Sequence, residues 1–169
     1  RDEILKKIDA IRKGVTGKLP NIYFLHGEVD DEDMNHLYNH PKIKAMISLT
    51  KGEGFGRPLL EFTQSKKPVI ATNFSGHLDF LDKEFASLIP GELKPVHESA
   101  IQEGLIIKES KWFAPDIDFI QLLLKDYFSS YKAYEVKGKQ LGYRCKTKFS
   151  FEKMSEELIS IIDKKFNID

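Results

Sequence analysis

The chain has 169 residues, of which 41% are apolar and 31% are charged, an ordinary composition for a globular domain. Its 26 basic residues balance 26 acidic ones, so no global positive field favours nucleic acid as a partner. The single cysteine excludes an intrachain disulfide and fits a reducing compartment. No apolar run approaches the roughly 20 residues that span a bilayer, so we expect about one cytoplasmic domain.

Residues 3–49 alternate between helical and extended patterns. A helix is predicted over Glu3–Arg12, where apolar residues recur at three- and four-residue spacing. A second helix is predicted to begin in the acidic run Asp30–Asp33, because acidic side chains stabilise the first turn of a helix. The apolar runs Asn21–His26 and Ile43–Leu49 are each predicted to form a strand.

The middle of the chain continues this alternation. A short helix is predicted from Pro58 to near Ser65, followed by a strand over Pro68–Thr72. Another short helix is predicted near His77–Leu81, and a fourth strand over Phe85–Ile89. Nearly continuous apolar strands separated by helices predict an α/β fold with a Rossmann-like parallel sheet and helices on both faces.

The C-terminal part is less regular at first. Proline and glycine turn signals are spread over Pro90–Pro115. Apolar residues then recur at helical spacing from Ile117 to Tyr131. A final helix is predicted over Phe151–Phe166, with its apolar residues on one stripe.

The most informative segment is Thr50–Glu61, which joins an apolar strand to a helix. Three glycines in five positions permit a tight turn and a close approach of a ligand to the backbone. Pro58 suits the first position of the helix, whose free N–H groups then face the turn. The carboxylates of Glu53 and Glu61 flank the helix start and are able to hold sugar hydroxyls. An anion site beside two carboxylates indicates a nucleotide-sugar pocket.

Three loops are expected to form the edge of this pocket, because ligands of open parallel sheets bind beyond the carboxyl ends of the strands. They are residues 26–28, residues 50–57 and residues 73–77. Their convergence depends on the sheet being parallel.

The motif Gly52–Glu61 resembles the signature of the retaining glycosyltransferases with the two-domain GT-B architecture, in the large group-1 branch and similar to family 4. That signature has two glutamates eight positions apart around Gly-Phe-Gly and Pro, followed by a strand such as Lys67–Ala71. The other segments that resemble the family are residues 22–29, Gly76, Asp79, residues 112–116 and residues 148–154. The resemblance covers most of the chain and implies one half of a GT-B fold.

The resemblance implies that residues 1–169 form the C-terminal, nucleotide-sugar-binding domain of a hexosyltransferase that retains anomeric configuration. The implied partners are a nucleotide sugar, an acceptor (saccharide, lipid-linked or protein) and an N-terminal acceptor-binding domain of the same full-length protein. That domain, with the arginine and lysine that hold the diphosphate in the family, would precede Arg1, so the truncated chain is expected to be inactive alone.

The resemblance also implies that catalysis uses no metal and no other cofactor. It places the protein in polysaccharide or glycoconjugate biosynthesis. The expected location is the cytoplasm, with a peripheral position at the inner membrane face left open.

Roles of single residues follow from the resemblance as well. Glu53 is implied to be the catalytic carboxylate that faces the transferred sugar, and Glu61 to bind the ribose hydroxyls. The implied contacts to the donor sugar and diphosphate come from Gly54, Phe55, Gly56, Arg57 and Lys51. The positions implied to lie near the base are Gly27, Glu28 and Val29. His77 is a candidate sugar contact, and Arg57 departs from the family pattern, which usually has an apolar residue there.

Simpler explanations compete for several of these residues. A Glu61 in the first turn of its helix would stabilise that helix through the dipole alone. Lys51 and Arg57 are better explained as solvated surface charges, and His77 is equally consistent with starting a helix. Cys145 has no histidine or acid beside it in the sequence, which favours a structural role.

Two other classes of function compete with a transferase. One is a non-catalytic module that binds a nucleotide or phospho-ligand on a Rossmann-like sheet. The other is a doubly wound domain whose glycine turn serves packing alone. The sequence does not define the sugar, the base or the acceptor. The final helix is expected to leave part of its apolar face uncovered, because in relatives this region packs back towards the N-terminal domain.

Overall fold

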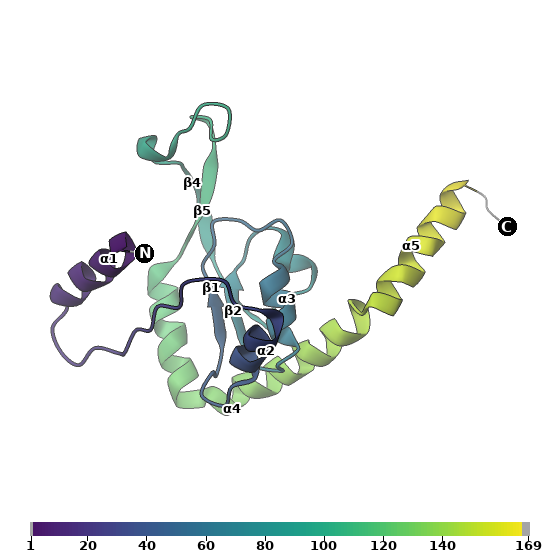
Figure 1. Cartoon of the computed structure of the whole chain (residues 1–169), viewed down its shortest axis with the longest axis horizontal. Helices are drawn as coiled ribbons and strands as arrows, with labels where there is room; N and C mark the ends of the chain where they lie inside the picture. Colours follow the sequence, from purple (N-terminus) through teal and green to yellow (C-terminus); the bar gives the residue numbers. More distant parts are fainter. Residues whose placement is uncertain (1, 167–169) are drawn as a thin grey trace. The chain divides into compact units, whose positions relative to one another are not determined.

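The computed structural model describes residues 2–166 of the chain (Figure 1). These residues form two compact units with a boundary between Leu37 and Tyr38. Arg1 and residues 167–169 of the predicted domain lie outside the described range. The sheet and the glycine turn both belong to the second unit.

The first unit contains one complete helix and the start of another. Helix α1 (Asp2–Lys13) has acidic residues in its first turn and basic residues in its last, which suits the helix dipole. Helix α2 (Asp31–Asn39) begins where Asp30 Oδ1 accepts a hydrogen bond from the backbone N–H of Asp33 at 2.8 Å. Both predicted helices are confirmed.

The strand predicted over Asn21–His26 is wrong. This segment has no regular secondary structure, and Tyr23 within it is 83% exposed. An apolar pattern supplies the faces of a strand, but a strand also needs a neighbour whose backbone groups pair with its own. The described structure gives this segment no such neighbour.

The second unit is built on a three-stranded parallel sheet. Strands β1 (Met46–Ser48), β2 (Val69–Thr72) and β3 (Ser87–Ile89) lie in the order β1-β2-β3. Both neighbouring pairs are parallel, with Ile47 opposite Ile70 and Ala71 opposite Leu88. The predicted parallel order is therefore confirmed, although β1 is shorter than the apolar run that predicted it.

Helices cover both faces of this sheet. Side chains alternate between faces along a strand, so Val69 and Ala71 of β2 pack with residues of α3 (Arg57–Thr63), whereas Ile70 faces the other way. Helix α4 (Ile117–Lys148) serves both faces. Its first half packs on Ile70, and its second half joins the α3 side.

The change of face by α4 coincides with a kink at Ser130, whose backbone is not helical (φ −123°, ψ 27°). Figure 1 shows α4 bending as it passes around the sheet. The predicted α/β fold with a parallel sheet and helices on both faces is confirmed, and it is consistent with a Rossmann-like half of a GT-B architecture.

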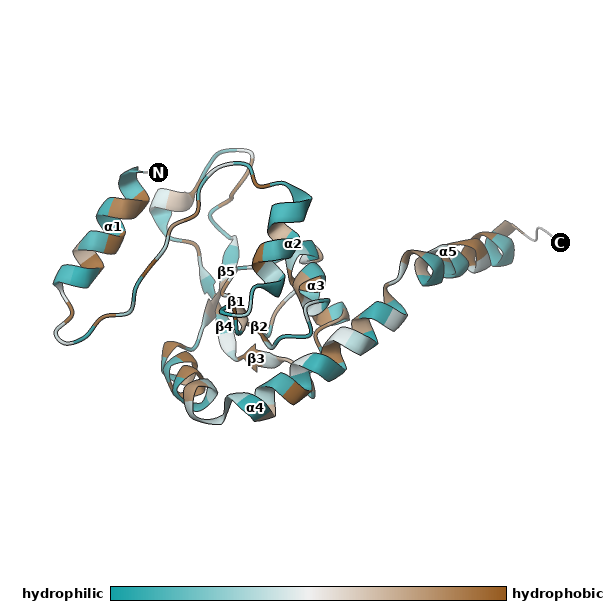
Figure 2. Cartoon of the chain, turned by 60° about the horizontal axis from the view of Figure 1, so that its bottom comes forward, coloured by the Kyte–Doolittle hydropathy of each residue, from teal (hydrophilic) through white to brown (hydrophobic). Residues whose placement is uncertain are grey.

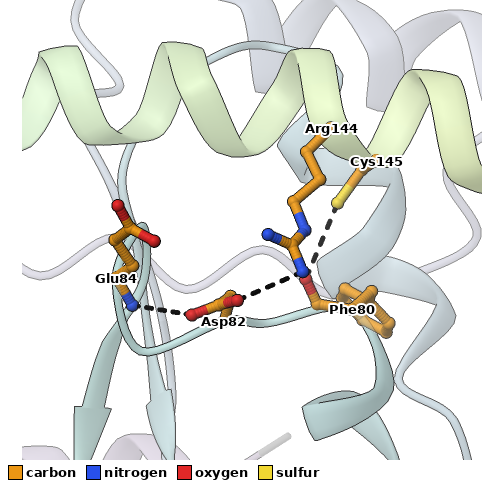
Figure 3. Close-up of polar contacts among 5 residues, drawn as sticks. All are labelled: Phe80, Asp82, Glu84, Arg144 and Cys145. Carbon is orange, nitrogen blue, oxygen red and sulfur yellow. Dashed lines mark hydrogen bonds and ion pairs between the residues drawn. The ribbon is translucent and has the colours of Figure 1, made fainter.

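The end of α4 is fastened to the loop before β3 (Figure 3). Arg144 forms an ion pair with Asp82 at 3.2 Å, and Asp82 also accepts the backbone N–H of Glu84 at 2.9 Å. Cys145 is fully buried, and its thiol donates to the carbonyl of Phe80. Burial raises the pKa of the Cys145 thiol. Its place within the core cluster agrees with the structural role predicted for it.

The less regular segment after β3 contains an antiparallel hairpin that the sequence did not predict. Strand β4 (Gly91–Pro95) pairs with β5 (Lys111–Pro115), with Leu93 opposite Phe113. The hairpin extends away from the parallel sheet (Figure 1) and carries the one-turn helix η2 (Glu98–Ala100) in its long loop. All five residues of β4 are exposed, which explains the weak signal.

The final helix α5 (Phe151–Phe166) leaves its apolar residues uncovered (Figure 2). None of its residues is buried, and Phe151 is 83% exposed. The other exposed apolar side chains of this helix are Met154, Leu158, Ile159, Ile161, Ile162 and Phe166. The predicted lack of cover is confirmed. Within residues 2–166, no helix is both long and apolar enough to cross a membrane.

Candidate functional site

Two loops meet at the carboxyl edge of the parallel sheet. The glycine turn, residues 50–56, lies between β1 and α3, and residues 73–77 run from the end of β2 into the 3₁₀ helix η1 (Gly76–Asp79). The backbone N–H of Gly76 donates to the carbonyl of Glu53 at 3.0 Å. Convergence of these two predicted loops is confirmed. The third loop, residues 26–28, belongs to the first unit, and its place at this edge stays a prediction.

Side chain and backbone of the second loop both hold Glu53. The hydroxyl of Ser75 accepts the Glu53 N–H at 2.6 Å and donates to the Glu53 carbonyl at 3.0 Å. A Cβ placed on Gly76 would lie 1.9 Å from the carbonyl oxygen of Gly54, so only glycine fits there. The two loops are therefore joined backbone to backbone.

The turn itself leaves three of its amide groups without a partner among the described residues, and Gly56, which carries one of them, is buried. Within the described residues, no hydrogen bond uses the backbone N–H groups of Gly54, Phe55 or Gly56. The ring of Phe55 packs against Phe80 at a centroid distance of 5.3 Å and against Phe149 at 6.2 Å. The Phe55 ring is thus held by two aromatic neighbours although it is 37% exposed. Backbone N–H groups without a partner in a glycine turn suit an anion.

His77 lies beneath the turn. Its side chain is fully buried, and its Nε2 lies 2.6 Å from the carbonyl of Thr72 at the end of β2. Gly56 has φ 84°, and a Cβ placed on it would approach the Cβ of His77 to 2.9 Å. The ring thus supports the turn from below. A sugar contact by His77 stays a prediction, and the buried side chain exposes no surface for one in this conformation.

Glu61 is the fifth of the seven residues of α3, and no acidic residue occupies the first turn of this helix. The alternative that placed Glu61 in the first turn is therefore wrong, because the helix begins at Arg57 and is short. The dipole does not account for a glutamate near the C-terminal end of a helix. Instead, Glu61 Oε1 pairs with Arg57 Nε at 2.9 Å, and both side chains are largely exposed.

Lys51 is held by a residue far along the chain. Its ammonium lies 3.6 Å from the centroid of the Trp112 ring, a cation–π contact. The carbonyl of Lys51 accepts the backbone N–H of Phe113 at 3.3 Å, and the Phe113 ring stacks on Phe74 at 5.1 Å. Strand β5 therefore forms one wall beside the turn. The sequence analysis assigned no individual role to Trp112 or to Ser75.

The positions predicted near the base, Gly27, Glu28 and Val29, belong to the first unit, and their role stays a prediction. Gly27 adopts φ 131°, a conformation that favours glycine. Among residues 2–166, no group of three or more His, Cys, Asp or Glu side chains is arranged to hold a metal ion.

Comparison with known families identifies one match. The profile of the family described as "Glycosyl transferases group 1" matches residues 17–106, just over half of the chain. The match includes the glycine turn, Glu61 and the loop that carries Ser75 and His77. A comparison with curated proteins gave no match.

Proposed function

The chain belongs to the glycosyl transferases of group 1, and from this membership we propose that it binds the nucleotide-sugar donor of a retaining GT-B enzyme. One observation supports this above all. The Glu53 turn combines three free backbone N–H groups with a carboxylate whose own backbone is fixed by hydrogen bonds. The N–H groups suit the diphosphate, and the carboxylate suits the sugar that leaves it.

In the proposed reaction, the bond between the sugar and the diphosphate breaks while the sugar carries positive charge. A nucleophilic group of the acceptor forms the new bond to the same sugar carbon, and its proton goes to the leaving diphosphate. The carboxylate of Glu53, a half-buried residue, would stabilise that charge and orient the sugar hydroxyls. The N–H groups of Gly54, Phe55 and Gly56 would stabilise the negative charge that grows on the leaving diphosphate. Glu61 would accept hydrogen bonds from the ribose hydroxyls, and Gly27, Glu28 and Val29 would lie near the base.

The two cations of the turn are proposed as minor contributors to diphosphate binding. Lys51 lies over Trp112, and Arg57 is paired with Glu61. Two glutamates beside a diphosphate repel it, so turnover would need further cations and an acceptor-binding domain. We therefore propose turnover for a longer protein, with a saccharide, a lipid-linked molecule or a protein as the acceptor and without a metal ion.

Glu61 offers the sharpest test. UDP, GDP and ADP are titrated by calorimetry into the wild-type chain and the Glu61→Ala variant, each beside its 2′,3′-dideoxy analogue. If Glu61 binds both ribose hydroxyls, the variant loses a charge-assisted pair, about a 10- to 150-fold drop in affinity. The wild type should prefer the ribose form of one base strongly, and the variant should hardly distinguish the two forms.

Glu135→Ala is the matched control, because Glu135 also pairs with a cation four residues away on a helix. It should leave every affinity unchanged. Equal discrimination by wild type and Glu61→Ala would remove Glu61 from the site. Binding that ignores the base would favour a phospho-ligand module, and no binding at all would favour a turn that serves packing alone.

A further inference from the structure

Ser75 has a backbone conformation that serine rarely adopts. Its φ of 78° and ψ of −161° lie in a region populated almost only by glycine. Lys66 is the only other non-glycine residue with positive φ among residues 2–166. A serine in such a conformation is strained and persists only where its surroundings hold it there.

The hydroxyl of Ser75 shows what holds it. This single Oγ accepts the N–H of Glu53 at 2.6 Å and donates to the carbonyl of the same residue at 3.0 Å, across a sequence separation of 22 residues. The Glu53 carbonyl also accepts the N–H of Gly76 at 3.0 Å. Three hydrogen bonds therefore fix the peptide planes on both sides of Glu53.

These three hydrogen bonds restrain the glycine turn at Glu53. The next three N–H groups, those of Gly54, Phe55 and Gly56, have no partner within the described residues. Two of the three residues are glycines, which restrict the backbone least. The direction in which the Glu53 side chain leaves the backbone follows from its backbone dihedrals, so the contacts to Ser75 set that direction.

A glycine at this position would adopt the same backbone without strain. The strain is therefore explained by the hydroxyl and not by the path of the chain. We propose that Ser75 is a positioning residue that directs the Glu53 carboxylate towards the transferred sugar, an inference that rests on the proposed function. Ser75 acts through Glu53, and we assign it no contact of its own with the donor.

Two variants separate the hydroxyl from the strain. Ser75→Ala removes both hydrogen bonds and keeps a side chain in the strained conformation. Ser75→Gly removes the same bonds and relieves the strain, so the relief offsets part of the stability that the lost bonds supplied. Ser65→Ala is the matched control, because the Ser65 hydroxyl also donates to a backbone carbonyl, that of Phe62 at 2.7 Å, after the other end of α3.

The first measurement is hydrogen exchange of the Glu53 amide by NMR in the unliganded chain. Loss of its acceptor should speed exchange about tenfold in both Ser75 variants, the factor expected for one ordinary hydrogen bond. The second is calorimetry with UDP-glucose, ADP-glucose and GDP-mannose, each beside its nucleoside diphosphate. The affinity gained from the sugar should fall about tenfold in both variants, and affinity for the diphosphate should stay unchanged.

Unchanged Glu53 exchange in both variants would overturn the inference, and so would a sugar-dependent gain within about twofold of wild type. Loss in Ser75→Ala with full retention in Ser75→Gly would also overturn it, because packing and not the hydroxyl would then matter. A wild-type chain that binds no nucleoside diphosphate sugar would overturn the proposed function. In that case Glu53 exchange still decides whether Ser75 holds the turn.

Discussion

The joined loops at the carboxyl edge of the sheet and the helix α5 are opposite extremes of packing within one unit. In the loops, a Cβ placed on Gly76 would lie 1.9 Å from a backbone atom. In α5, no residue is buried. Contacts within this unit therefore explain why the loops need glycine at particular positions. They do not explain why α5 carries apolar residues on its surface. Apolar surface of this extent on a helix usually marks an interaction site.

Gly76→Ala tests the packed extreme and should have the largest effect. The added Cβ meets the Gly54 carbonyl, which is backbone and has no rotamer to change, so one of the two loops must move. We expect unfolding by denaturant to show a loss of at least about 3 kcal/mol. The Glu53 turn should lose its hydrogen bond from Gly76 as well.

Gly52→Ala is the control within the same turn, because its added Cβ would lie 3.7 Å from Phe74, an ordinary contact. It should be neutral or up to about 1 kcal/mol more stable, since alanine restricts the unfolded chain. Equal stability of the two variants would show that the loops are not locked together as described.

A pair of leucines compares the two extremes directly. Leu141 of α4 is fully buried in the core, whereas Leu158 of α5 is 58% exposed. Leu141→Ala should lower the free energy of unfolding by about 2–5 kcal/mol through lost burial and the cavity left behind. Leu158→Ala should change it by less than about 0.5 kcal/mol.

Both substitutions replace leucine by alanine in a helix, so differences in helix propensity cancel in the comparison. Denaturant midpoints measured under identical conditions give the result. A cost above about 1 kcal/mol for Leu158→Ala would mean that α5 is covered in solution, by a second copy or by the rest of the chain.

The order of elements from β1 to β3 could be predicted because buried parallel strands are short, continuous apolar runs. Val69–Thr72 is such a run, and all four residues are buried. The same rule produced the error at Asn21–His26, because an apolar run does not supply a pairing partner. The hairpin was missed for the opposite reason, since β4 pairs through its backbone while its side chains remain in solvent.

The site was predictable to the extent that residue types define it. The glycines and the flanking glutamates are visible in the sequence around Glu53. Ser75 was not, because its role depends on a backbone dihedral and a contact across the sheet edge. Trp112 was recognised only as part of a family segment, because the hairpin that brings it to Lys51 was not predicted.

The burial of a tyrosine in the core predicts how stability depends on pH. Burial raises the pKa of Tyr127 to about 12, opposed in part by its hydrogen bond with Ser87. The unfolded chain has the ordinary value near 10 and loses its proton first, so unfolding becomes easier as the pH rises from 10 through 12. This loss should amount to about 1–2 kcal/mol for Tyr127.

Tyr127→Phe should flatten the dependence of stability on pH above 10. Burial and the hydrogen bond to Asp126 also raise the pKa of Tyr134 to about 12, so part of the slope should remain in this variant. Denaturation curves at several alkaline pH values provide the measurement. Parallel slopes for wild type and Tyr127→Phe would contradict the burial of the phenol.

Arg57→Gln should have a small effect on stability. It removes the charge at a position where the family pattern usually has an apolar residue. Arg57 is 81% exposed and Glu61 is 48% exposed, so their 2.9 Å ion pair should contribute no more than about 0.5 kcal/mol to stability. Its effect on ligands distinguishes two roles. If Arg57 only pairs with Glu61, a nucleoside and its diphosphate should change in affinity by the same small factor, within about threefold.

If Arg57 contacts the diphosphate, the variant should lose affinity for the diphosphate alone, by about tenfold or more, and the loss should shrink in high salt. We expect the first result, because Arg57 Nε already bonds to Glu61. Calorimetry with uridine and UDP at two salt concentrations separates the outcomes. Lys139→Gln, which breaks the equivalent exposed pair with Glu135 on α4, is the control and should leave both affinities unchanged. A selective loss for UDP in Arg57→Gln would make Arg57 a diphosphate ligand, and its pairing with Glu61 would then describe only the unliganded turn.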